Sequence, residues 1–316
     1  MRRLLTNWKN LNDAGLLGLN ARNADYIMRC NPRRNYPLVD DKVRCKQVLQ
    51  AHDMPTPELI GVITKTGDSG KLAQYLHGEA QFVIKPANGS GGDGVLVIAG
   101  YQGGVYRSVD GRLFDVDQIQ HHLTNVISGL YSLGGQPDHA MLEALVKFDP
   151  VFDEIAFQGV PDIRVIVYCG VPVMAMVRLP TRRSQGKANL HQGAIGAGIA
   201  LSTGRTTGGV VGNRRVAEHM DTGASILGFE IPHWRRILNM SAACYEAVGL
   251  GYLGVDVVLD RDRGPLILEL NARPGLNIQI ANRKGLRRRM QRVEREADLG
   301  ATPEERARWA RTHFRD

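Results

Sequence analysis

Three oxygen-bearing side chains stand near the C-terminal end of the sequence, in two apolar runs that flank a short polar turn. If that turn comprises residues 261–264, counting back from it places Asp256 opposite Glu269 on neighbouring strands. Asn271 then lies on the same face as Glu269, because strand side chains repeat every two residues. Facing carboxylates destabilise a sheet unless a cation neutralises them, and carboxylate and amide oxygens suit Mg²⁺. The sequence therefore predicts a metal site on a hairpin; a solvent-facing polar hairpin is the alternative.

A second segment, VIKPANGSGGDG at residues 83–94, indicates a strand followed by a glycine-rich turn. Strand-forming residues 95–98 come next, so the segment lacks the following helix of a dinucleotide fingerprint, and the lysine of a Walker loop is missing. A glycine turn between two strands can place backbone N–H groups over phosphates, and Lys85 could reach the same anion. A mobile hairpin tip with a surface lysine is the alternative. The predicted phosphate-binding residues of the turn are Gly89, Ser90, Gly91, Gly92 and Gly94.

Residues 141–146 form an apolar run with one acid, Glu143, between the glycine-rich turn and the predicted metal hairpin. The backbone of such a strand can hydrogen-bond an adenine edge, and Asp149, Asp153 or Glu154 could bind the ribose hydroxyls. An ordinary core strand is the alternative. The predicted nucleotide contacts in this region are Glu143, Ala144, Leu145, Val146 and Glu154.

Arg164 and Arg178 occupy otherwise apolar strands, and a buried arginine needs an anion. A polyphosphate or carboxylate ligand would satisfy that need, and so would an internal salt bridge, for example with Asp162. Between residues 181 and 215 the chain becomes rich in Gly, Thr, Ser and Arg and loses its periodicity. We expect a long loop there, and long loops within compact domains are usually functional.

Strands and helices alternate along most of the chain, and no internal repeat of fixed period is present. Hydrophobic periodicity and the positions of Gly and Pro define the elements. They predict a helix over 41–51, strands over 82–84 and 95–98, a hairpin over 162–180 that turns at Gly170, and a helix over 232–248.

The composition indicates a soluble, cytoplasmic protein with an affinity for anions. The net charge is +8, and 316 residues can bury a substantial core. The four cysteines form no CxxC pair, and no apolar run is long enough to span a membrane. Much of the positive charge lies at residues 283–292, where no aromatic residues alternate with the basic ones. We therefore predict a solvated helical tail there and no binding to nucleic acid or membrane.

With these motifs in place, the chain resembles the ATP-grasp superfamily, and within it the branch of RimK-type and alpha-L-glutamate ligase-like proteins. The resemblance covers residues 41–275 and rests on the order and spacing of the motifs. It implies an α+β protein with the ATP-grasp fold, in which two α+β subdomains grip ATP, with a short N-terminal lead-in where relatives carry a full pre-grasp domain. The implied parts are a lead-in (1–40), an N-subdomain with the glycine-rich flap (41–140), a C-subdomain with the metal hairpin (141–282) and a basic tail (283–316).

The resemblance also implies an ATP-dependent, ADP-forming carboxylate–amine ligase that makes an amide or peptide bond through an acyl phosphate, with a glutamate-like amino acid among its substrates. ATP and two Mg²⁺ ions, or Mn²⁺, are the implied cofactors, and a small-molecule or peptide carboxylate and an amine are the substrates. The family's two nucleotide-binding lysines correspond to Lys42 and Lys85, and its metal ligands to Asp256, Glu269 and Asn271. The implied catalytic residues are Arg164, Arg178, Arg273 and Asn271, and the implied substrate contacts are Arg178, Asn189, His191, Arg273 and Gly275.

Two other functions are compatible with the same motifs. A phosphotransferase would stop after phosphoryl transfer to a hydroxyl or a histidine, and a nucleotide-binding regulator would keep the fold without the chemistry. Because the lead-in is short, the sequence does not define the site that binds the second substrate. The lead-in itself, the tail, a second subunit or a partner protein could complete that site.

Overall fold

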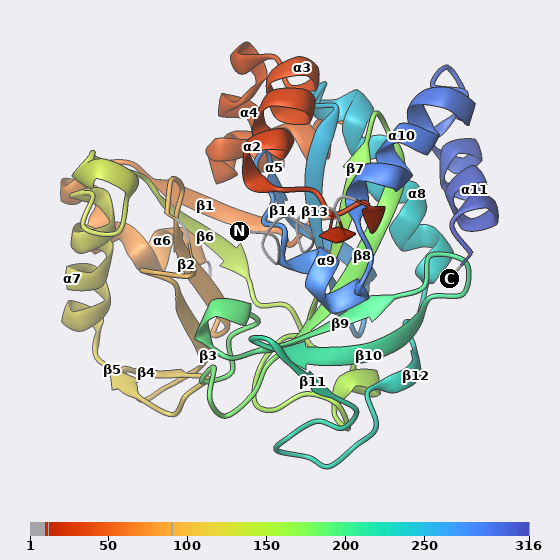
Figure 1. Cartoon of the computed structure of the whole chain (residues 1–316). Helices are drawn as coiled ribbons and strands as arrows, with labels where there is room; N and C mark the ends of the chain where they lie inside the picture. Colours follow the sequence, from red (N-terminus) through yellow and green to blue (C-terminus); the bar gives the residue numbers. More distant parts are fainter. Residues whose placement is uncertain (1–9, 12, 77, 90, 316) are drawn as a thin grey trace, which may run out of the picture.

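The computed structural model describes residues 10–11, 13–76, 78–89 and 91–315. Two antiparallel sheets dominate the structure, with helices packed around the larger one (Figure 1). None of the helices in the described part of the chain is long and apolar enough to cross a membrane.

The smaller sheet has six strands in the order β1-β6-β2-β3-β4-β5. Its core lies between the sheet and two helices, α6 (Leu72–Leu76) and α7 (Val116–Ile127). Asp115 begins α7 with a reciprocal capping box to Gln118, which satisfies backbone N–H groups at the helix start. The strands are β1 (Leu59–Ile63), β2 (Phe82–Pro86), β3 (Leu96–Gln102), β4 (Val105–Ser108), β5 (Leu113–Phe114) and β6 (Ala140–Ala144).

The larger sheet has eight strands in the order β11-β10-β9-β8-β7-β13-β14, with β12 also paired to β10. Helix α8 (Trp234–Val248) packs on β7, β8 and β13, and α9 (Asn277–Asn282) packs on β8, β9 and β10. The strands are β7 (Asp162–Tyr168), β8 (Val171–Leu179), β9 (Ile195–Ile199), β10 (Arg205–Val211), β11 (Arg214–Val216), β12 (Leu227–Glu230), β13 (Tyr252–Asp260) and β14 (Gly264–Asn271).

The predicted helices over 41–51 and 232–248 and the hairpin that turns at Gly170 are confirmed. Helix α5 (Lys42–Ala51) begins at Asp41, whose carboxylate accepts hydrogen bonds from the N–H groups of Val43 and Arg44. The long loop expected at 181–215 is partly wrong, because β9, β10 and most of β11 lie within it. The sequence of β9, IGAGI, is fully buried, and its glycines hide the alternation of a strand.

Two predicted boundaries also differ from the sheets. The boundary at 140/141 falls inside β6, which belongs to the smaller sheet. Helix α5 packs on α8 and β14 of the larger body and also on the smaller sheet, where Val43 contacts Ala87 and Met141. The tail is not a solvated helix: α10 (Leu286–Glu296) and α11 (Pro303–His313) both pack on the larger core. The tail residues buried in that core are Leu286, Met290, Val293, Ala307, Ala310 and Phe314.

The lead-in packs along the larger body and shares its core (Figure 1). Leu17, Tyr26, Ile27 and Val39 are its buried apolar residues. Its described elements are α2 (Leu19–Ala21), a π-helix (Arg22–Ile27), α3 (Met28–Cys30), a 3₁₀-helix (Arg33–Asn35) and α4 (Pro37–Asp40). Further 3₁₀-helices in the chain are Thr66–Lys71, Leu133–Gly135, Pro150–Phe152 and Leu190–Gln192.

Candidate functional site

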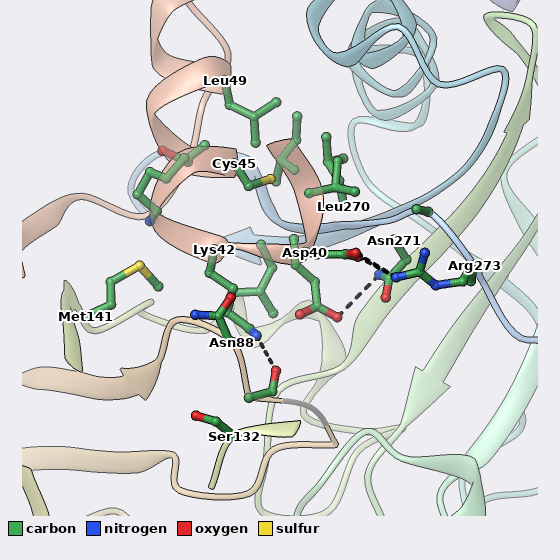
Figure 2. A pocket seen from close by; sticks show the side chains of 18 of the residues that line it. Asp40, Lys42, Cys45, Leu49, Asn88, Ser132, Met141, Leu270, Asn271 and Arg273 are labelled. Atoms are coloured by element: carbon green, nitrogen blue, oxygen red, sulfur yellow. Dashed lines mark hydrogen bonds and ion pairs between the residues drawn. The ribbon is translucent and has the colours of Figure 1, made fainter. Parts of the chain in front are cut away.

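A cavity of about 540 Å³ lies where the two sheets approach each other. Helix α5 and strand β14 form one side, and the glycine-rich turn after β2 forms the other (Figure 2). Its polar lining combines ammonium, carboxylate, amide and backbone groups. These lining residues are Asp40, Lys42, Lys46, Thr56, Asn88, Gly89, Gly91, Ser132, Gln136, Glu269, Asn271 and Arg273.

A row of charged residues crosses the larger sheet beside this cavity. Strand pairing places Glu269 opposite Asp256, and Asp256 opposite Arg164 on the next strand. Two residues along β7, Asp162 pairs with Arg178 of β8. Five charged side chains thus occupy neighbouring positions on four consecutive strands, and we refer to them as the charged row.

The predicted pairing of Asp256 with Glu269 is confirmed, but the turn and the strand register that produce it differ from the prediction. The turn is one residue shorter than predicted, since Asp260 pairs with Gly264. Val257 then pairs with Ile267, and Leu268 is the extra residue of a β-bulge. The bulge shifts the register by one residue and so brings Asp256 opposite Glu269.

Asp256 is the hub of the charged row. Arg164 donates two hydrogen bonds to its carboxylate, from Nε at 2.7 Å and from Nη2 at 2.5 Å, and Arg178 Nη2 donates a third at 2.9 Å. Arg178 also makes a bidentate ion pair with Asp162. Both arginines therefore form ion pairs within the protein, which is the salt-bridge alternative to an anionic ligand. They lie next to the predicted metal ligands.

The carboxyl groups of the charged row have opposite pKa shifts. Burial by itself raises the pKa of Asp256, but the Arg164 and Arg178 guanidiniums outweigh it and hold that pKa below its ordinary value. Burial and the Asp256 charge raise the pKa of Glu269. Burial likewise raises the pKa of Asp162 to about 6, against the opposing effect of Arg178. Among the described residues, Glu269 is thus the cavity carboxylate that forms no ion pair.

These residues fit a divalent cation. Glu269 and Asn271 line the cavity, and Asn271 Nδ2 lies 3.3 Å from both Glu269 Oε1 and Asp256 Oδ2, so the three side chains converge. No cluster of three His, Cys, Asp or Glu side chains able to hold a metal exists among the described residues. Two carboxylates and one amide are a sparse oxygen set, typical of Mg²⁺ that also keeps waters and phosphate oxygens.

The glycine-rich turn forms the opposite side of the cavity. Gly91, Gly92 and Gly94 have φ values of +69°, +82° and +72°, which favour glycine. A side chain at Gly91 or Gly92 would meet open space, whereas one at Gly94 would collide with the Tyr131 ring. Backbone N–H groups of such a turn can approach a phosphate closely. Ser90, predicted as part of this turn, lies outside the described residues.

Asp138 holds the base of the turn, although no sequence signal pointed to it. Its buried carboxylate accepts hydrogen bonds from Asn88 N at 3.0 Å, Asn88 Nδ2 at 2.8 Å and Ser132 Oγ at 2.5 Å. A bridge between Gly89 and Ser132 adds a backbone contact. The turn is therefore anchored at its first residues and open at Gly91 and Gly92.

Two lysines of α5 line the cavity near the glycine-rich turn, and a third, Lys85, lies on β2. Lys42, at the first turn of α5, lines the cavity and donates to the Gly89 carbonyl. Lys46, one helical turn later, is buried and ion-paired with Glu143, which also pairs with Lys85. Sequence reasoning missed Lys46, although its i+4 spacing from Lys42 placed both on one helix face. Burial lowers the pKa of Lys46, and the Glu143 charge opposes that shift.

The lead-in supplies part of the cavity's rim. Arg273 Nη2 donates to both Asp40 oxygens, at 2.8 and 2.7 Å, and its guanidinium lies over the Tyr36 ring at 4.8 Å. The Asp40 and Arg273 side chains are 45% and 48% exposed, so both remain accessible. Asp40 and Tyr36 were not predicted as site residues.

Two buried lead-in side chains hold the segment that follows Asn271. Asn31 Nδ2 donates to the Tyr252 and Ala272 carbonyls, at 2.8 and 3.1 Å, and Asn31 Oδ1 accepts from Tyr252 N at 2.7 Å. Arg22 Nη1 donates to the Pro274 carbonyl at 2.9 Å. The lead-in therefore positions the end of the predicted metal strand and the chain beyond it.

Several predicted site residues lie outside the cavity lining. Lys85 and Glu143 form the buried ion pair just described, β6 ends at Ala144, and Leu145 and Val146 are half-buried beyond it. Glu154 is exposed. The predicted substrate residues Asn189, His191 and Gly275 do not line the cavity either; Asn189 caps a 3₁₀-helix by accepting from His191 N.

A family model described as sugar-transfer associated ATP-grasp matches residues 21–295. No curated protein sequence matches the chain. The match therefore spans both sheets and the second half of the lead-in.

Three solved structures with a similar arrangement share 14–17% sequence identity with the chain. D-cycloserine synthetase DcsG is 16% identical, with 88% of this chain and 80% of that one covered and a TM-score of 0.47. D-alanine–D-alanine ligase from Bacillus anthracis is 17% identical, with 88% and 70% covered and a TM-score of 0.45. ATP-grasp ligase PsnB, complexed with a minimal precursor, is 14% identical, with 78% and 56% covered and a TM-score of 0.40. The chain thus spans only about half the length of PsnB.

Proposed function

The chain belongs to the sugar-transfer associated ATP-grasp family, and from this membership we propose that it is an ATP-dependent ligase that joins a carboxylate to an amine through an acyl phosphate. The observation that carries the proposal is the pairing of Glu269 with Asp256 beside the cavity, with Asn271 between them. A buried carboxylate pair, in which burial and then the neighbouring charge raise the pKa of Glu269, suits a cation-assisted phosphoryl transfer.

On this proposal, ATP occupies the cavity with its phosphates between the glycine-rich turn and β14. The N–H groups of the turn and the Lys42 ammonium would bind the phosphates, while Glu269, Asn271 and Asp256 would hold Mg²⁺. Bound Mg²⁺ would neutralise charge on the phosphate oxygens. The apolar side chains of Cys45, Leu49 and Met141 also line the cavity and offer a surface for the base.

The reaction then needs no nucleophilic side chain from the protein. A substrate carboxylate oxygen attacks the γ-phosphorus, ADP leaves, and the amine displaces phosphate from the acyl carbon with loss of a proton. Arg164 and Arg178 act from behind Asp256, where they fix its carboxylate and offset the negative charge of the site. Arg273 is accessible at the rim and is our candidate for binding the substrate carboxylate.

The chemistry of the site indicates the classes of the substrates and not their identities. The net charge of +8 and the accessible Arg273 favour an acidic carboxylate, such as a glutamate-like amino acid or a peptide C-terminus. The family's description links it with sugar transfer, which adds amino sugars and sugar acids to the amines and carboxylates to be tested.

The test is Mg²⁺-dependent release of ADP from ATP against pairs of carboxylates and amines drawn from these classes, with mass spectrometry of the products. A ligase releases ADP and phosphate only when both partners are present, and its product is lighter than their sum by one water. A Glu269→Gln variant, which keeps the side-chain volume, serves as the matched control and should release no ADP above background. Phosphate retained on a single acceptor would instead identify a phosphotransferase.

A further inference from the structure

Two cysteines far apart in the sequence lie on either side of Gly251, the residue that precedes β13. Cys30 ends α3 of the lead-in, and Cys169 lies in the turn between β7 and β8. Both are half-buried, and both contact the same residue, Gly251. Neither residue has a role in the proposed ligase site.

The backbone of Gly251 brings the two cysteines together. Gly251 N donates to the Cys30 carbonyl at 3.0 Å, and Cys169 N donates to the Gly251 carbonyl at 2.7 Å. A Cβ at Gly251 would lie 2.8 Å from Cys30 Cβ and 3.6 Å from Cys169 Sγ. Only glycine leaves room for both side chains, so the close approach is built into the backbone on both sides.

Polar groups around Cys30 favour its thiolate. Its sulfur lies 3.7 Å from Tyr168 Oη, which in turn accepts from Arg29 Nη2 at 2.6 Å and donates to Glu294 at 2.6 Å. The Cys169 thiol, then Tyr168 and Arg29, lower the pKa of Cys30 to about 6, although burial opposes the shift. The neighbouring Cys30 thiol, together with burial, raises the pKa of Cys169. The two thiols therefore differ, and Cys30 is the one whose thiolate is favoured.

We propose that Cys30 and Cys169 form a redox modification site, a dithiol that a hydroperoxide or a small disulfide converts reversibly to a Cys30–Cys169 disulfide. With hydrogen peroxide, the Cys30 sulfur attacks one peroxide oxygen, the O–O bond breaks, and Cys30 becomes a sulfenic acid as water leaves. The Cys169 sulfur then attacks the Cys30 sulfur, the S–O bond breaks and a second water leaves. Two thiols are oxidised, and one peroxide is reduced to two waters.

The other two cysteines provide an internal contrast. Cys45 and Cys244 are buried, and burial raises the pKa of Cys45 to about 12 and that of Cys244 as well. Both therefore stay protonated at neutral pH, and we expect neither to react at the rate of Cys30.

The experiment treats the full-length reduced protein with hydrogen peroxide at neutral pH, followed by non-reducing digestion and mass spectrometry. We expect a peptide pair linked through Cys30 and Cys169 and lighter by two hydrogens, which dithiothreitol converts back to the thiols. In Cys169→Ser, dimedone should trap Cys30 as the sulfenic acid. In Cys30→Ser, Cys169 should stay unmodified, and Cys244→Ala should behave as the wild type.

Two results would overturn the proposal: oxidation of the native protein without the linked peptide, or alkylation of Cys30 by iodoacetamide no faster than in the urea-unfolded chain. Circular dichroism of each variant shows whether it is folded, and the alkylation rate of the wild type decides the matter if a variant is not. The outcome is independent of the ligase proposal, because no nucleotide or substrate is required.

Discussion

The two walls of the cavity differ in how their functional groups are held. On the larger-sheet wall, Glu269, Asp256 and Arg164 stand side by side on three paired strands, and hydrogen bonds between side chains fix them further. On the smaller-sheet wall, the groups are backbone amides of a turn whose glycines at 91 and 92 face open space. One wall is rigid and carries charges, and the other is adaptable and carries dipoles.

This difference suggests a division of labour. Metal-assisted phosphoryl transfer requires oxygen ligands within a few tenths of an ångström of their working positions, and a sheet register supplies that accuracy. Phosphate binding by backbone amides tolerates movement, because a flexible turn can close over its ligand. The following predictions test whether rigidity and charge reside on one wall and adaptability on the other.

The largest expected effect is on stability, at the hub of the charged row. Asp256→Asn leaves Arg164 and Arg178 buried without their shared carboxylate, and breaking a buried ion pair of this kind costs about 3–5 kcal/mol. Because the folded pKa of Asp256 lies below its ordinary value, its contribution is present above about pH 4 and is lost as pH falls further.

Urea denaturation at several pH values measures this loss. Asp262→Asn is the matched control, since it removes a carboxylate from the exposed turn of the same hairpin and should leave the unfolding midpoint near that of the wild type. Equal midpoints for the two variants would mean that the charged row does not hold the wall together.

The next effect is on catalysis without loss of stability. Glu269→Ala should lower Mg²⁺-dependent ADP release by about 100-fold or more, the size of effect seen when one preorganised charge stabiliser is removed. Burial and Asp256 raise the pKa of Glu269, so its ionisation destabilises the folded state as pH rises above about 4. Without Mg²⁺ at neutral pH, Glu269→Gln should therefore melt at or above the wild-type temperature. A lower melting temperature in calorimetry would contradict the interpretation of Glu269 as the unpaired carboxylate.

The convergence of Asp256, Glu269 and Asn271 and the glycine-rich turn were predictable from the sequence, because strand periodicity and the choice of glycine are local signals. The pairing of Asp256 with Arg164 across two strands was not predicted. The ATP-grasp resemblance is confirmed at the level of the superfamily, and the glutamate-ligase branch stays a prediction. The pairing of Asp256 with Glu269 was predicted from a turn one residue too long, and a bulge at Leu268 compensated for that error. A bulge depends on how two strands twist against each other, which local sequence does not encode.

The residues that were missed depend on contacts between distant segments. Lys46, Asp138 and Asp40 act through partners 97, 50 and 233 residues away, namely Glu143, Asn88 and Arg273. The prediction that the basic tail is solvated was wrong for the same reason, because its packing depends on contacts with distant segments. Its arginines dominate the composition, while the few apolar residues of α10 and α11 that reach the core lie one helical turn apart among them.

Two lysines one helical turn apart on α5 test whether ATP binding and stability depend on different residues. Lys42→Ala should weaken ATP affinity about tenfold, the worth of one charge-assisted hydrogen bond, and leave stability nearly unchanged. Lys46→Met should instead lower stability by about 1–3 kcal/mol, because it leaves one oxygen of the buried Glu143 without its cation. Calorimetric titration with ATP and urea denaturation distinguish the two, and each variant is the control for the other. The comparison fails if both variants lose affinity and stability together.

The smallest expected effect concerns the adaptable wall. Gly92→Ala meets no steric obstacle, since no atom lies within 4 Å of the added methyl group, but its φ of +82° strains an L-residue by about 1 kcal/mol. Gly103→Ala carries a similar strain at φ +60°, also in open space, in the turn between β3 and β4 away from the cavity. We expect the two variants to lose equal stability, while Gly92→Ala alone weakens ATP binding, by a few fold. If Gly103→Ala weakens ATP binding as much, the effect comes from the smaller sheet as a whole, and the turn is not the adaptable element that its open glycines indicate.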